Sequence, residues 1–191
     1  MTCMNQNKFN PFEAAKEILE ETQETCRFRF GFEIPLILDF RLKSKSAIGQ
    51  ATSVLGDPSR NKISLSKMAV EQMNYTEIRD LVIHEFAHLL CRKLYPKASR
   101  SHGKDWKQCV YSLGGTNVNA TCDNSRIRLH KDDVLVKCKC DLKYKFVPKK
   151  VAKEIELGVC YLCSICHKKI KLAKEKDYIK FNQSKGETVC A

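Results

Sequence analysis

The pattern of hydrophobic and polar positions predicts an α+β domain in the first two thirds of the chain. A helix is predicted to begin after Asn10, an N-cap residue followed by Pro11 at the first helical position, and apolar residues mark one of its faces as far as Cys26. Three short apolar runs then indicate strands, at Ile34–Phe40, Ala47–Val54 and Lys62–Ser66. The residues Gly56-Asp57-Pro58-Ser59 predict a turn between the last two.

Helices are predicted to follow the strands. A short helix is expected over Lys67–Met73. A longer helix should begin at Asn74 or Thr76, both N-cap residues, and run to Tyr95, because Pro96 cannot continue it. A further helix is expected over Lys104–Leu113, where Gly114-Gly115 ends it.

The longer helix contains His84-Glu85-Phe86-Ala87-His88. Residues four apart share one helix face, so both imidazoles can reach one metal ion, while Glu85 is placed to accept a proton from an attacking water molecule. The flanking residues are mostly apolar, and three ionisable groups in such a helix need a partner that offsets their burial. The segment therefore predicts a zinc site.

A catalytic zinc ion usually has three protein ligands, so a third ligand is required. A metzincin would need glycine and histidine where the chain has Cys91 and Leu94. No glutamate lies between Glu85 and Glu154 to act as a thermolysin-like ligand. The remaining candidates are His102, Asp105, Asp123 and His130. Among them His102 is best placed, because it follows a loop long enough to reverse the chain and precedes the next helix.

Cysteine and lysine dominate the chain beyond residue 130, where we place a domain boundary. Five of the 11 cysteines crowd between Cys138 and Cys166. The N-terminal residues have no apolar segment typical of a secretion signal, so we expect a cytoplasmic protein with reduced thiols. In such a protein, crowded cysteines indicate metal binding rather than disulfides.

Charge is also concentrated in this C-terminal part. The whole chain carries a formal net charge of +12. Residues 130–191 contribute 15 lysines and no arginine against 8 acidic residues, or +7, whereas residues 1–129 contribute +5 from 19 basic and 14 acidic residues. Lysine suits sequence-independent attraction to phosphate, so DNA is an expected partner of this segment. No apolar run is long enough to span a membrane, and we expect a monomer.

Three segments together resemble the SprT-like zinc metalloproteases: Leu81-Val-Ile-His-Glu-Phe-Ala-His-Leu-Leu, His102-Gly-Lys-Asp-Trp-Lys and Leu113-Gly-Gly. The resemblance implies a zincin-like protease domain with a small mixed sheet over residues 1–129. It also implies a small β-rich zinc ribbon with a basic tail over residues 130–191. On this basis the catalytic zinc ligands are His84, His88 and His102, and Glu85 is the general base.

Family members often append a zinc ribbon with a C-x-C knuckle and a Y-x-C-x-x-C knuckle. The matching residues, which imply a structural zinc ion, are Cys138, Cys140, Cys163 and Cys166. Cys160 and His167 lie close enough in sequence to replace ligands of the second knuckle. The resemblance further implies an endopeptidase acting on DNA-associated or DNA-crosslinked proteins, with the ribbon assisting DNA binding. The alternative is a non-proteolytic, zinc-binding, DNA-associated adaptor.

Overall fold

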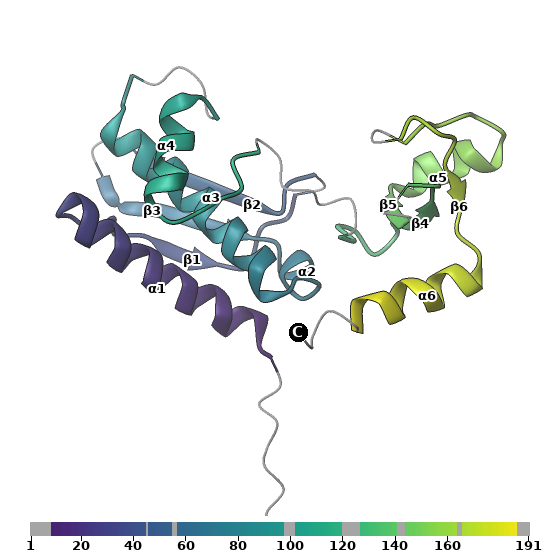
Figure 1. Cartoon of the computed structure of the whole chain (residues 1–191), viewed down its shortest axis with the longest axis horizontal. Helices are drawn as coiled ribbons and strands as arrows, with labels where there is room; N and C mark the ends of the chain where they lie inside the picture. Colours follow the sequence, from purple (N-terminus) through teal and green to yellow (C-terminus); the bar gives the residue numbers. More distant parts are fainter. Residues whose placement is uncertain are drawn as a thin grey trace, which may run out of the picture. The chain divides into compact units, whose positions relative to one another are not determined.

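The computed structural model divides the chain into two compact units, Met1–Cys122 and Asp123–Ala191. It describes residues 9–44, 46–54, 57–97, 102–119, 127–140, 144–163 and 166–186. Both units combine helices with a three-stranded sheet (Figure 1). Within the described residues, no helix is long and apolar enough to cross a membrane.

The sheet of the first unit is mixed. It has the order β1-β3-β2, formed by β1 (Ile37–Asp39), β2 (Gly49–Val54) and β3 (Asp57–Leu65). The central strand β3 pairs in parallel with β1 and antiparallel with β2. The expected α+β class and the three strands are confirmed.

Strand lengths differ from those predicted. The first strand is shorter, and Pro35 before it uses its carbonyl to accept from the Asn61 side chain. The third strand is longer, because Asp57 already pairs with Val54. Pro58 fits within β3 because the parallel pairing with β1 begins only at Lys62, so no β1 carbonyl faces the proline nitrogen. The turn predicted over residues 56–59 is therefore wrong for residues 57–59, and Gly56 lies outside the described residues.

The described residues of the first unit also form four helices, α1 (Pro11–Phe30), α2 (Lys67–Val70), α3 (Tyr75–Leu94) and α4 (Lys104–Ser112). Asn10 caps α1 as predicted, accepting from the backbone nitrogens of Phe12 and Glu13. Asn74 caps α3 in a reciprocal capping box with Glu77. Figure 1 shows α1 and α3 running along the sheet, and both contribute to the unit's core.

Helix α3 is the central element of this core. Residues along most of its length are buried, including Ile78, Leu81, Val82 and Phe86, each at most 1% exposed. It packs against α1, α4 and β2. The motif histidines therefore lie on a helix that is fixed by neighbours on several sides.

The second unit contains an antiparallel sheet of order β5-β4-β6, formed by β4 (Val134–Lys137), β5 (Tyr144–Val147) and β6 (Lys171–Leu172). Two helices accompany it, α5 (Lys149–Glu156) and α6 (Glu175–Gly186). This unit is less β-rich than expected, since more of its described residues are helical than extended.

Helix α6 is attached to the sheet by a partly buried ion pair. The Asp177 carboxylate lies 2.7 Å from Lys137 Nζ and also accepts from the Lys174 backbone nitrogen. The bonds from these two donors hold the pKa of Asp177 below its usual range. Phe181, 4% exposed, packs edge-on against Phe146 of β5. These contacts order a segment whose sequence reads as a lysine-rich tail.

Candidate metal centres

Three imidazoles meet between α3 and α4. His84 and His88 project from the same face of α3, and His102 precedes α4. The His84 Nε2 atom lies 3.3 Å from His88 Nε2 and 3.2 Å from His102 Nε2. One nitrogen from each ring lies within 4.8 Å of the others, a grouping that could hold a metal ion.

These separations fit a tetrahedral ion. Two nitrogens bound to zinc at about 2.1 Å with tetrahedral angles lie about 3.4 Å apart. Burial, together with the other histidines, lowers the pKa of His84 to about 4 and that of His88 to about 3. Burial also lowers the pKa of His102. All three rings are therefore neutral near pH 7, and neutral imidazole is the form that binds a metal.

The Glu85 carboxylate is buried beside this group but is not a member of it. It is 6% exposed, and burial raises its pKa to about 7. A hydrogen bond from the Ala51 backbone N–H opposes this shift. A carboxyl group with a pKa near 7 can both accept and release a proton at neutral pH, as a general base that later acts as a general acid must.

The indole ring of Trp106, on α4, packs against all three imidazoles of the histidine group. Its ring is fully buried, with centroids 4.8 Å from His84, 5.4 Å from His88 and 4.6 Å from His102. Among the described residues, its indole nitrogen is a buried polar atom without a hydrogen-bond partner. The ring thus contacts every imidazole of the group through apolar packing rather than through its N–H.

None of the other described third-ligand candidates is grouped with these imidazoles. Asp105 is on α4 but outside the histidine group. His130 belongs to the second unit and lies 3.4 Å from the Asp132 carboxylate. Asp123 lies outside the described residues. Only His102 among these candidates is placed with His84 and His88 in the described part of the chain.

Four cysteines form a second group in the second unit. The sulfurs of Cys138, Cys140, Cys163 and Cys166 lie within 4.8 Å of one another. The Cys140–Cys163 distance of 3.9 Å matches the roughly 3.8 Å between two sulfurs on one tetrahedral zinc ion. Cys138 and Cys140 are 2.7 Å apart, so their side chains would have to separate to bind the same ion. These thiols pack against Val136 and Ile170 in the small core of the unit.

The two alternative ligands of the second knuckle are outside this group. Cys160 is exposed, and its sulfur is not grouped with the others. His167 follows Cys166 in a left-handed conformation, with φ at 52°, and its backbone N–H donates to the Cys163 carbonyl over 2.9 Å. The imidazole of His167 is not a member of the cysteine group.

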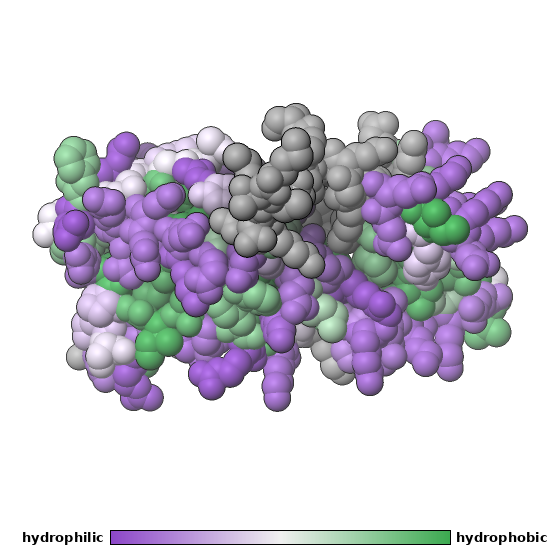
Figure 2. Space-filling model, turned by 90° about the horizontal axis from the view of Figure 1, so that it is seen from below, coloured by the Kyte–Doolittle hydropathy of each residue, from purple (hydrophilic) through white to green (hydrophobic). Residues whose placement is uncertain are grey.

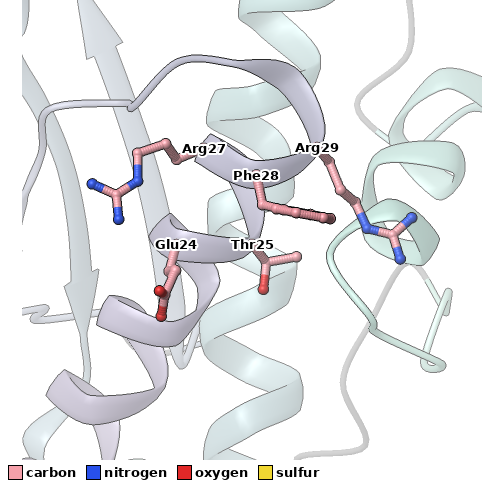
Figure 3. A pocket seen from close by; sticks show the side chains of 5 residues that line it. All are labelled: Glu24, Thr25, Arg27, Phe28 and Arg29. Atoms are coloured by element: carbon pink, nitrogen blue, oxygen red, sulfur yellow. The ribbon is translucent and has the colours of Figure 1, made fainter.

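A surface hollow lies at the C-terminal end of α1. It is lined by Glu24, Thr25, Arg27, Phe28 and Arg29 (Figure 3). Phe28 is 89% exposed there, and the two arginines point in opposite directions. None of these residues belongs to the histidine or cysteine group, and a single exposed aromatic residue is ordinary on a protein surface.

Comparison with known proteins identifies the family. The SprT-like family model matches residues 15–126, so the chain belongs to the SprT-like family. The chain is also similar to Protein SprT from Vibrio parahaemolyticus serotype O3:K6 (strain RIMD 2210633), with 26% identity over 140 residues that cover 73% of this chain and 79% of that protein. No solved structure gives a significant match. The family match includes the histidine group and ends before the cysteine group.

Proposed function

We propose that the first unit is a zinc-dependent endopeptidase with a zincin-like fold. The observation that carries this proposal is the meeting of three neutral imidazoles with the buried Glu85 carboxylate beside them. A purely structural metal site has no use for a base at that position. Membership of the SprT-like family supports the same function.

The residues divide the chemical work. His84, His88 and His102 would hold zinc, which supplies Lewis acidity that polarises a carbonyl group and makes water more acidic. Glu85 accepts a proton from the attacking water molecule and delivers it to the leaving amine. Trp106 keeps the imidazoles in place and excludes solvent from one side of them.

In the second unit, we propose a structural zinc ion bound by Cys138, Cys140, Cys163 and Cys166. Support comes from the position of these thiols within a small core, where a metal ion can stabilise a unit that buries little apolar surface. The unit would then be a zinc ribbon elaborated by α5 and α6.

We also propose that the second unit binds DNA and brings the protease to DNA-associated protein substrates. Eleven of its described lysines are exposed, against three exposed acidic residues. Three of these lysines, Lys149, Lys150 and Lys153, form an α5 lysine cluster on one short helix. In Figure 2, which shows the whole chain from below, hydrophilic residues cover much of the visible surface. Clustered cations of this kind release counterions from phosphates.

Cleavage assays with a DNA-binding protein as substrate test the proposal. The wild-type chain should cleave the substrate, and single-stranded or duplex DNA should increase the rate by bringing enzyme and substrate together. Removal of zinc should abolish cleavage and zinc addition should restore it. A zinc-loaded chain without cleavage under any of these conditions would contradict the proposal and favour a non-proteolytic adaptor.

A further inference from the structure

Strand β2 is an edge strand, and its hydrogen-bonding pattern decides which backbone groups face outward. In the antiparallel β2–β3 pair, Gly49 lies opposite Leu65 and Ala51 opposite Ile63. Just before the strand, the Ser66 N–H donates to the Ile48 carbonyl. Hydrogen-bonded pairs alternate along such a ladder, so the N–H and C=O groups of Gly49 and Ala51 point away from β3. A register shift between Thr52 and Val54 interrupts the alternation, and Ser53 is placed by its contact with α3 instead.

Helix α3 supplies side chains to these outward-facing groups. The Ala51 backbone N–H faces the Glu85 carboxylate and lowers its pKa. Two turns further along α3, the Arg92 guanidinium donates to the Ser53 carbonyl over 3.3 Å. Glu85 and Arg92 are seven residues apart and share a helix face, so α3 runs along the open edge of β2.

Gly49 is required for the close approach of β2 to Glu85. A Cβ atom at Gly49 would lie 2.6 Å from Glu85 Oε1 and 2.8 Å from Leu81 Cδ1. Leu81 is 1% exposed and has no room to retreat, whereas the carboxylate is the far end of a flexible side chain. Any side chain at residue 49 would therefore displace the carboxylate first.

We propose that Gly49 and Ala51 are positioning residues for Glu85, so that the edge of β2 holds the carboxylate beside the histidine group without letting it become a fourth ligand. Gly49 provides the space and Ala51 provides the hydrogen bond. This inference rests on the proposed function, because it assigns a role in proton transfer. Neither residue stands out in the sequence, since the contact joins segments more than thirty residues apart.

Two variants remove the two contributions separately. Ala51→Pro removes the N–H while leaving the ladder intact, because that N–H is not used by β3 and proline is tolerated on an edge strand. Gly49→Ala introduces the methyl group that meets Oε1. The matched control is Ala51→Ser, which keeps the N–H.

The assay measures kcat and KM for protein cleavage by each full-length, zinc-loaded variant, with Glu85→Gln in parallel. Displacement of a reacting group by about 1 Å can cost about 100-fold in rate, so Ala51→Pro and Gly49→Ala should each lower kcat by tenfold or more. Their KM, their zinc affinity in competition with a chromophoric chelator, and the visible spectrum of their Co²⁺ forms should match wild type. The Ala51→Ser control should keep wild-type kcat.

The possible results separate this inference from the proposed function. Wild-type kcat in both Ala51→Pro and Gly49→Ala, with Glu85→Gln inactive, would overturn the positioning role and leave the protease assignment intact. An altered Co²⁺ spectrum accompanying the loss of kcat would also overturn it, since the histidine group would then be the part affected. An inactive wild type would refute the protease and the positioning role together. If Ala51→Pro fails to fold, Gly49→Ala decides the matter alone.

Discussion

Replacement of Trp106 by phenylalanine should leave the free energy of unfolding of the metal-free protein nearly unchanged, although the residue is fully buried. Two contributions of opposite sign meet at this position. The smaller ring loses packing worth about 1–2 kcal/mol. Removal of an indole N–H that has no partner among the described residues recovers about 1–3 kcal/mol. The net change should therefore lie between a loss of about 1 kcal/mol and a gain of about 2 kcal/mol in stability.

The alanine variant provides the contrast. Trp106→Ala leaves a cavity under three imidazoles and should cost about 3–5 kcal/mol, before any gain from the lost N–H. It should also weaken zinc binding by about 10–100-fold, the range found when groups that orient metal ligands are removed. The phenylalanine variant keeps a ring against the imidazoles and should keep wild-type zinc affinity.

Urea unfolding followed by far-ultraviolet circular dichroism measures the first quantity, and competition with a chromophoric chelator measures the second. If Trp106→Phe loses as much stability as Trp106→Ala, the indole N–H makes a hydrogen bond in the native protein and the reasoning fails. If Trp106→Ala binds zinc as tightly as wild type, the ring does not hold the imidazoles in place.

Three other predictions concern charge and metal. Burial raises the pKa of Glu85 from 4.5 to about 7, so the unfolded chain releases this proton at a lower pH than the folded chain does. Between pH values below 4.5 and above 7, the metal-free wild type should therefore lose about 3 kcal/mol of stability relative to Glu85→Gln, measured by urea unfolding. A difference that does not change with pH would contradict the burial of this carboxylate. Cys163→Ser should reduce bound zinc from two ions per chain to one by atomic absorption, whereas the exposed Cys160→Ser should retain both. Replacement of the three lysines of the α5 lysine cluster by glutamine should reduce the slope of log affinity for DNA against log salt concentration by up to about 2.7. An unchanged slope would place the phosphate contacts elsewhere.

Local sequence signals predicted the helices of the first unit well. Asn10 and Asn74 each cap a helix through hydrogen bonds formed within three residues, so their effect is visible in the sequence. Pro96 marks the end of α3 for the same reason, since a proline acts on its own turn of helix. Each of these boundaries depends on neighbours along the chain.

Features that depend on distant residues were not predicted. The lysine-rich composition of the C-terminal segments does not indicate how they pack, yet α5 buries Ala152 and α6 is fixed by Asp177, which pairs with a lysine 40 residues earlier. In the histidine site, too, the contacts between distant residues were not predicted. The spacing of His84 and His88 predicts that both point to one side, but the approach of Gly49 and Ala51 to Glu85 depends on how α3 packs along β2.

The most direct test of the proposed catalytic centre measures zinc content and the rate of protein cleavage on the same preparation of Glu85→Gln. Glutamine occupies nearly the same volume as glutamate and leaves the three imidazoles in place, but it cannot accept the proton. We predict full zinc occupancy at the histidine site together with a loss of about 100-fold or more in cleavage rate. Cleavage at the wild-type rate by the fully zinc-loaded variant would contradict the account.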